Sequence, residues 1–308
     1  MQRLLDDRGI CVDALWDDID PESSLLRDEN PMAVRFRSDS TGPEDIILPG
    51  IQADVRKQDL LRLQGLERGP ASQLNDSVVN GVLEQIVADR EPRQPLRPLL
   101  LDSSAWVAIA ACMDDPSEVL DTHLQAMCGR LDRPDLPAKR GNQAAAFEAW
   151  GLQHALQAHR LIIPIFHSEL QHWSLGVIDM QAATVQHIDS CHDDGRHDAC
   201  ERELMRWVSS ELFQQHCPEK AWQRAAREPA AQQHNSDDCG VFTILFAASK
   251  IAGVPVIKQL SFEQVFMARQ WLMAYLAADY AMDEFRGDAG MLGDANAALD
   301  ASRAGARE

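Results

Sequence analysis

Basic residues are scarce in this sequence. Its 308 residues hold 29 lysines and arginines against 48 aspartates and glutamates, a formal net charge of −19. A surface of this charge repels phosphate groups, and no cluster of basic residues offsets the repulsion. Nucleic acids and anionic membrane surfaces are therefore not expected as partners.

Long apolar stretches and paired cysteines are also missing. The apolar run AWVAIAAC at 105–112 is far shorter than the roughly 20 residues of a membrane-spanning helix. The first residues carry acids where a secretory signal has its basic end and apolar stretch. The seven cysteines include no CxxC pair, which argues against a disulfide framework. We expect no membrane association and an intracellular location, in the nucleus, the cytoplasm or both.

Composition divides the chain into three parts. Residues 1–44 are rich in Asp, Glu, Ser and Pro, and we interpret them as an acidic extension with one short amphipathic stretch at 10–19. Residues 45–282 carry the periodic apolar patterns of a folded domain. Residues 283–308, rich in Ala, Gly and Asp, are predicted to be disordered.

The first half of the domain is dominated by helical periodicity. Apolar residues recur at three and four positions from 74 to 86, which predicts a helix capped by Asn75 or Asp76. The following RPLLLDSS predicts a short strand before a helix at 106–113. Residues 114–160 show a polar helical pattern, so we expect outer helices there.

The period then changes to that of buried strands. Apolar and β-branched residues alternate or run together, and DMQAA between the last two strands favours a hairpin. The helices that follow include one that begins at Cys239 and ends before Gly253. The predicted elements are strands at 161–166, 172–179 and 184–190, and helices at 199–213, 239–252 and 262–280.

Cys239 occupies a position that favours a reactive thiol. At the start of a helix, backbone N–H groups and the helix dipole stabilise negative charge, which lowers the pKa of a thiol. Asp237 and Asp238, expected at the N-cap, oppose this effect unless their carboxylates point away. A general base close in space is therefore needed for a catalytic role.

The predicted hairpin supplies that base. His172 begins one strand and Asp189 ends its partner, so an antiparallel pairing brings the two side chains together. An imidazole backed by a carboxylate has a fixed tautomer and a stabilised charged form, as a general base for a nucleophile requires. Gln233, just before Cys239, offers an amide that could bind the oxyanion of acyl transfer.

Three segments at this point resemble one enzyme family. HWSLGVID, TVQHIDS and QQHNSDDCGVF are similar, in order and spacing, to the catalytic segments of ubiquitin-like protein proteases, the Ulp and sentrin-specific protease family. QLNDSVVN resembles the WLND segment of that family, so the resemblance covers roughly residues 55–282. It implies that Cys239 is the nucleophile, His172 the general base and acid, Asp189 its orienting carboxylate and Gln233 the oxyanion donor.

The resemblance also implies a narrow substrate channel. Trp173 stands where the family has the Trp that roofs this channel, which admits a diglycine tail because glycine has no side chain. Gln73 replaces the family's usual Trp of WLND. We therefore expect catalysis to be intact and the channel to be more open or more polar.

The fold implied by the resemblance is α+β and papain-like, with a small mixed central sheet packed against the helix of the nucleophile and surrounded by helices. The implied reaction is cysteine-dependent hydrolysis after the C-terminal diglycine of a ubiquitin-like modifier, free or in a protein conjugate, with no cofactor. SUMO is the first expected modifier, followed by NEDD8 and ubiquitin. Two alternatives stay open: an effector-type acyltransferase with the same residues, and a catalytically silent module that binds ubiquitin-like proteins.

A second group of residues has the chemical types of metal ligands. Cys191, His192, His197 and Cys200 lie close together in the sequence, with His187 nearby. The spacing CHx4HxxC matches no standard zinc signature. The sequence therefore predicts no metal site.

Overall fold

The computed structural model describes residues 46–48, 55–56, 59, 62–63, 72–89, 98–111 and 158–285. Three expectations fall outside these residues: the acidic extension at 1–44, the polar helices of 114–157 and the tail beyond 285. Within the described ranges, no helix has the length and apolar character needed to cross a bilayer.

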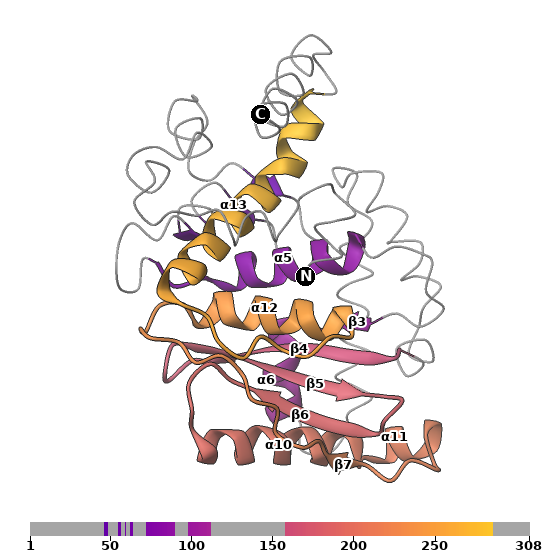
Figure 1. The fold of residues 1–308 in the computed structure, drawn as a ribbon. Coiled ribbons are helices and arrows are strands. Elements are labelled where there is room, and N and C mark those ends of the chain that lie inside the picture. Colours follow the sequence, from indigo (N-terminus) through magenta and orange to yellow (C-terminus); the bar gives the residue numbers. More distant parts are fainter. Residues whose placement is uncertain are drawn as a thin grey trace, which may run out of the picture.

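A five-stranded mixed sheet forms the centre of the molecule (Figure 1). Strands β4, β5 and β6 are antiparallel neighbours, while β3 pairs with β4 and β7 pairs with β6 in parallel. This confirms the predicted small mixed sheet and the β5–β6 hairpin. The strand order is β3 (Pro98–Leu100), β4 (Arg160–His167), β5 (His172–Asp179), β6 (Thr184–Ile188) and β7 (Gln223–Arg224).

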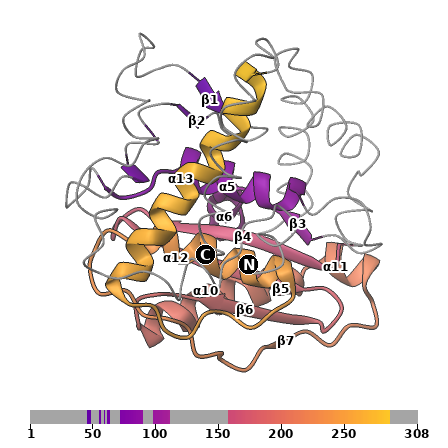
Figure 2. The same ribbon diagram turned by 45° about the horizontal axis from the view of Figure 1, so that its top comes forward.

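One face of the sheet is covered by α12 (Cys239–Ala252), with α5 (Asp76–Asp89) and α13 (Phe262–Phe285) beyond it (Figures 1 and 2). Almost every residue of α12 is buried, as expected for a helix that is apolar all round and lies between two layers. Burial of a large apolar side chain such as those of Phe242 and Phe246 contributes about 1.5–3 kcal/mol. Apolar packing therefore fixes the position of the helix that begins at Cys239.

The opposite face packs against α6 (Ser103–Ala111), α10 (Asp194–Val208) and α11 (Glu211–His216). Because side chains alternate along a strand, β5 turns Trp173 toward α12 and Ser174 toward α10, where it contacts His187. The sheet thus separates two hydrophobic cores, one on each face. Polar residues at the ends of its strands lie at the edges of these cores.

Several predicted boundaries needed correction. The single helix expected at 199–213 is wrong: α10 begins at Asp194, because Asp193 accepts a hydrogen bond from the Arg196 backbone N–H, and the chain breaks before α11. The helix expected at 106–113 begins at Ser103, after a cap by Asp102. Gly253 ends α12 in the left-handed conformation, as predicted, with φ 68°.

Three short strands escaped prediction. These are β7 and the separate pair β1 (Ile46–Leu48) and β2 (Val55–Arg56), of two or three residues each. Strands of this length contain too few residues for an alternating pattern to emerge. Helix α13 extends to Phe285, so the chain is helical slightly beyond the predicted start of the tail at 283.

Candidate active site

His172 and Asp189 meet at one end of the β5–β6 hairpin. His172 is the first residue of β5, and Asp189 directly follows β6. Nε2 of His172 lies 2.7 Å from Oδ1 of Asp189, and both residues are buried, with 7% and 2% of their surface exposed. The hairpin therefore brings the two residues together as its sequence predicted.

The Asp189 carboxylate is held on both oxygens. Oδ1 also accepts the Cys191 backbone N–H at 2.8 Å, and Oδ2 accepts Nε of Arg196 at 2.6 Å. Burial raises the pKa of Asp189, but hydrogen bonds to His172, Cys191 and Arg196 outweigh it and lower the pKa to about 2. The carboxylate is thus ionised and fixed in orientation.

Cys239 begins α12 and is fully buried. Its side chain hydrogen-bonds with His172, whose Nε2 is already engaged by Asp189, so Nδ1 faces the sulfur. Burial lowers the pKa of His172, whereas the hydrogen bonds to Asp189 and Cys239 raise it, and the net result is a pKa of about 9. At neutral pH a protonated His172 imidazole therefore lies beside the Cys239 sulfur.

Close packing sets the position of the first turn of α12. A Cβ on Gly240 would lie 2.8 Å from Cβ of Leu74, so only glycine allows this approach. The Leu74 carbonyl in turn accepts Nε1 of Trp173 at 2.8 Å. The segment before α5, the start of β5 and the start of α12 are thereby joined next to Cys239.

The carboxylate of Asp238, the residue directly before Cys239, is paired within the protein. Asp238 stands at the N-cap of α12 without a side-chain cap hydrogen bond, contrary to the expected capping role. Its carboxylate instead accepts Nε of the buried Arg269 at 2.6 Å. Arg269 also donates to the backbone carbonyls of Asp237, Arg62 and Ser72. The negative charge of Asp238 is therefore neutralised within the protein.

Gln233 lies in the loop that leads to Cys239. The Ser190 hydroxyl donates to its Oε1 at 2.7 Å, and its Nε2 donates to the Asn235 carbonyl at 2.6 Å. The Gln233 backbone N–H also donates to the Ser190 carbonyl at 2.8 Å. The carboxamide is fixed in orientation, and its second N–H hydrogen remains for another acceptor.

The residues expected to line the substrate channel are Trp173 and Gln73. Trp173 is 2% exposed and packs against Phe166 with ring centroids 4.8 Å apart. Gln73 is partly buried and donates from Nε2 to the Ser236 carbonyl at 3.1 Å. Gln73 therefore contacts the segment that carries Cys239.

Sequence reasoning missed three residues of this arrangement. Arg196 in α10 is the ion-pair partner of Asp189, which follows β6, and Arg269 in α13 is the partner of Asp238, which precedes α12. Each pair joins two different elements, so helical or strand spacing gave no signal. Asn235 accepts the backbone N–H groups of Asp237 and Asp238. An Asn two and three residues before those groups is typical of an Asx turn, so this role could have been inferred.

A separate polar cluster lies on the α10 side of the sheet. The Ser174 hydroxyl is 2.8 Å from Nε2 of both His167 and His187, and Nδ1 of His187 is 2.9 Å from Nδ1 of His197. Burial is the largest cause that lowers the pKa of His167 to about 4 and of His187 to about 3. Burial likewise raises the pKa of the Cys200 thiol to about 12. This cluster differs from the group of possible metal ligands considered in the sequence analysis, because it includes His167.

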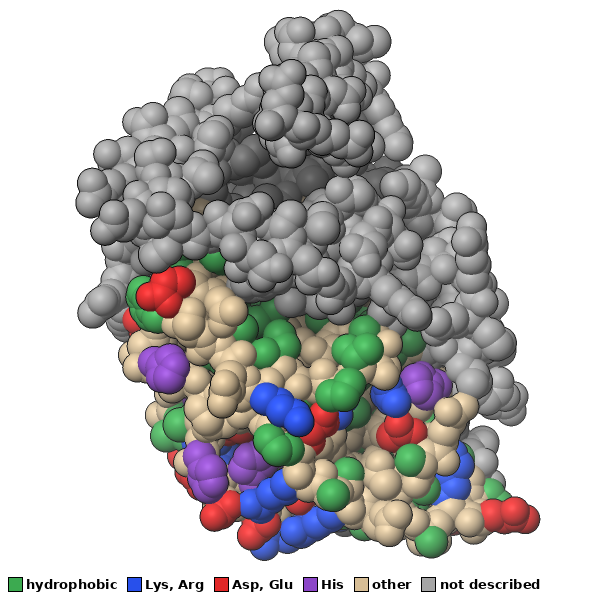
Figure 3. All heavy atoms as spheres, in the orientation of Figure 1, with side chains coloured by type: hydrophobic (Ala, Val, Ile, Leu, Met, Phe, Trp, Pro, Cys, Tyr) green, Lys and Arg blue, Asp and Glu red, His purple; other side chains and the backbone are tan. Residues whose placement is uncertain are grey.

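Charged residues on the surface beyond these sites are mixed in sign. Figure 3 shows basic and acidic side chains interspersed on the visible face of the described residues. Arg227 pairs with Asp194 and Asp198, and Arg224 pairs with Asp198 and Glu201. The net negative charge of the chain is therefore not reproduced as a single acidic area on this face.

Comparison with known families gives one match. Residues 142–279 match the Ulp1 protease family, C-terminal catalytic domain. This range includes His172, Asp189, Gln233 and Cys239. No curated protein sequence shows a significant match to the chain.

Solved structures share the fold. The C-terminal Ulp1 protease domain in complex with Smt3, the yeast ortholog of SUMO, is 16% identical, with a TM-score of 0.53 over 83% of this chain and 98% of that one. The catalytic domain of a Ulp1-like SUMO protease from Chaetomium thermophilum is 22% identical, with a TM-score of 0.53 over 83% and 93%. A SUMO protease Ulp1 with an oxidised catalytic cysteine is 15% identical, with a TM-score of 0.55 over 83% and 99%. The predicted α+β papain-like fold is confirmed.

Proposed function

We propose that this chain, in which residues 142–279 match the Ulp1 protease family, is a cysteine-type peptidase that hydrolyses the peptide or isopeptide bond after the C-terminal diglycine of a ubiquitin-like modifier. The observation that carries this proposal is the contact of His172 with both Asp189 and Cys239. A thiol, an imidazole and an orienting carboxylate in this order are the machinery of nucleophilic acyl transfer.

Acylation begins with the Cys239 thiolate. Its sulfur attacks the carbonyl carbon of the terminal glycine, and the carbonyl oxygen becomes an oxyanion. The Gln233 amide and the Cys239 backbone N–H stabilise that oxyanion. The C–N bond then breaks while His172 gives its proton to the leaving amine, which leaves a thioester on Cys239.

Deacylation returns the enzyme to its starting state. His172, now neutral, takes a proton from water as the water oxygen attacks the thioester carbonyl. The C–S bond breaks, the modifier leaves with a free carboxyl group that releases the second proton of the water to solvent, and the thiolate and imidazolium are restored. Asp189 keeps the imidazole in one orientation through both half-reactions.

SUMO is the first candidate for the modifier. Solved proteins that share this fold include SUMO proteases, one of them in complex with Smt3. NEDD8 and ubiquitin are the next candidates, because Gln73 stands where a channel Trp is expected and a polar channel wall changes which tails fit. Processing of precursors and release from conjugates use the same chemistry.

Free thiols support an intracellular site for this activity. Among the described residues Cys191, Cys200, Cys217 and Cys239 are free, as is usual in reducing compartments. We therefore propose that the enzyme works in the nucleus, the cytoplasm or both, where ubiquitin-like modifiers are attached to proteins.

Covalent labelling tests the activity and identifies the modifier. The wild-type protein is incubated with SUMO, NEDD8 and ubiquitin that carry a C-terminal electrophile, beside Cys239→Ala and the matched thiol control Cys217→Ser. We expect one modifier to label the wild type and Cys217→Ser, and none to label Cys239→Ala.

Two outcomes would reject the proposal. Labelling that persists in Cys239→Ala would remove Cys239 from the nucleophile role. Failure of every modifier to label the wild type, together with acylation of Cys239 by acetyl-coenzyme A, would instead identify an acyltransferase. Cleavage of a SUMO–glycine–glycine fusion by the wild type provides the catalytic readout.

A further inference from the structure

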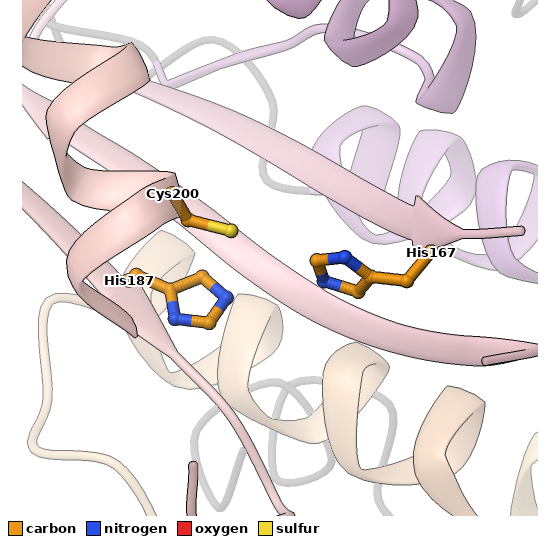
Figure 4. Close-up of side chains that lie close together, drawn as sticks. All are labelled: His167, His187 and Cys200. Carbon is orange, nitrogen blue, oxygen red and sulfur yellow. The ribbon is translucent and has the colours of Figure 1, made fainter. Parts of the chain in front are cut away.

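Three side chains outside the catalytic group converge on one point. One donor atom each from His167, His187 and Cys200 lie within 4.8 Å of one another. The three residues come from β4, β6 and α10, and Figure 4 shows their ring nitrogens and sulfur turned toward a common space. His187 and Cys200 are almost fully buried, with 2% and 3% of their surface exposed.

We propose that His167, His187 and Cys200 bind a divalent transition-metal ion of the zinc class. Two imidazole nitrogens and a thiolate are ligands that zinc takes readily, and a fourth position is then filled by water or by the Ser174 hydroxyl. Tetrahedral zinc, with bonds of about 2.0–2.3 Å, spaces its ligand atoms by roughly 3.3–3.8 Å. The ligands therefore need to close in by about 1 Å from their positions in the present structure.

His167 is placed to make this adjustment. It is the last residue of β4, is only partly buried and is followed by the turn at 168–171. Rotation of its side chain brings the ring toward His187 and Cys200 without moving the buried part of the strand. The remaining two ligands are anchored, one in β6 and one in α10.

The surroundings of His187 suit a metal ligand. Nδ1 of His187 lies 2.9 Å from Nδ1 of His197. If His187 binds the metal through Nε2, its Nδ1–H donates to His197, and such outer hydrogen bonds fix the tautomer and orientation of a ligating histidine. Nε2 is the nitrogen that faces Ser174, at 2.8 Å from its hydroxyl oxygen.

The proposed site is distinct from the catalytic pair but close to it. The rings of His167 and His172 are 6.0 Å apart. A soft metal could also bind His172 and the Cys239 thiolate, so the experiment has to separate the two thiols. It does not depend on the protease activity, since its readouts are metal binding and stability.

Cobalt binding separates the two sites. Metal-free protein is titrated with Co²⁺, and the cobalt–thiolate charge-transfer band is recorded in the near ultraviolet. We expect the band in the wild type, in Cys239→Ala and in the thiol control Cys217→Ser, and its loss in Cys200→Ser. Zn²⁺ should displace the cobalt and raise the melting temperature of the same three proteins only.

Two further variants protect the test against misfolding of Cys200→Ser. His167→Gln at the partly buried strand end should weaken Co²⁺ binding at least about tenfold. His197→Phe, which removes the outer hydrogen bond, should weaken it by about 10- to 100-fold. The proposal is overturned if the wild type shows no band, if the band follows Cys239 and not Cys200, or if both histidine variants bind Co²⁺ as the wild type does.

Discussion

Arg196 holds Asp189 by the carboxylate oxygen that His172 does not use. Its Nε donates to Oδ2 at 2.6 Å, while His172 engages Oδ1 at 2.7 Å. Arg196 is itself fixed, because its guanidinium also donates to the Cys191 carbonyl at 2.9 Å. We infer that Arg196 is a positioning residue that prevents the carboxylate from turning away from the imidazole.

The first prediction concerns this arginine. Arg196→Gln should lower kcat about tenfold with little change in KM, because a carboxylate with one free oxygen samples orientations that do not support the imidazole. Steady-state kinetics on a SUMO fusion measures the effect. Arg227→Gln, an exposed arginine that pairs with Asp194 and Asp198, is the matched control, and an equal loss in both variants would contradict the positioning role.

The second prediction concerns pH. In the proposed mechanism His172 donates a proton, which it holds below its pKa, and this pKa is raised to about 9; kcat/KM should therefore fall as pH rises through about 9. Asp189→Asn removes a hydrogen bond and a charge that raise this pKa, and the alkaline limb should therefore move to lower pH by at least about one unit. The control Asp198→Asn, at an exposed position, should leave the alkaline limb of the pH profile unchanged. If Asp189→Asn also leaves this limb unchanged, the assignment of the limb to His172 is contradicted.

The third prediction separates two adjacent glutamines. Gln233→Ala should lower kcat about 100-fold if its amide binds the oxyanion. Gln232→Ala should change kcat little, because Gln232 is exposed and its amide donates to the carbonyls of Asp189 and Ala230. Pre-steady-state acylation rates measure both. Similar rates for the two variants would remove Gln233 from the oxyanion site.

The contact of His172 with Asp189 could be predicted from sequence because a hairpin with a short turn imposes it locally. The helix that begins at Cys239 was also predictable, since an apolar run and Gly253 define both of its ends. These features depend on residues that are near one another in the chain or in a regular register. Local rules of propensity and alternation suffice for them.

The partners that complete the site depend on distant elements and were not predictable. Arg269, in α13, donates to the Asp238 carboxylate and also to the backbone carbonyls of Ser72 and Arg62. The break between α10 and α11 depends on Ser209 and Ser210, whose weak helix preference was hidden by apolar residues on either side. Tertiary contacts decided the pairing of Arg269 with Asp238, and no periodic pattern encodes it.

The fourth prediction tests the buried ion pair of Arg269 and Asp238. Arg269→Met leaves the Asp238 carboxylate buried without its charged partner, and side-chain exposures of 3% and 9% make that state costly. The free energy of unfolding should fall by about 3–5 kcal/mol in urea denaturation. Arg269→Met combined with Asp238→Asn should recover part of the loss. A double variant as unstable as the single variant would contradict the ion-pair explanation.

The fifth prediction concerns the width of the substrate channel at Gln73. Its amide donates to the Ser236 carbonyl, in the segment that leads to Cys239. An aromatic ring in place of this amide is therefore expected to lie beside the proposed path of the modifier tail. Gln73→Trp should raise the preference for Gly-Gly over Gly-Ala and Ala-Gly tails several-fold, because the added ring excludes the methyl group of alanine.

The comparison of kcat/KM across the three tails measures this preference, and Gln73→Ala is the control. Gln73→Ala loses the same hydrogen bond to Ser236 but adds no bulk, so it should relax the preference or leave it unchanged. If Gln73→Trp and Gln73→Ala shift the tail preference alike, the hydrogen bond and not the channel width controls selectivity. If neither variant shifts it, Gln73 does not line the channel.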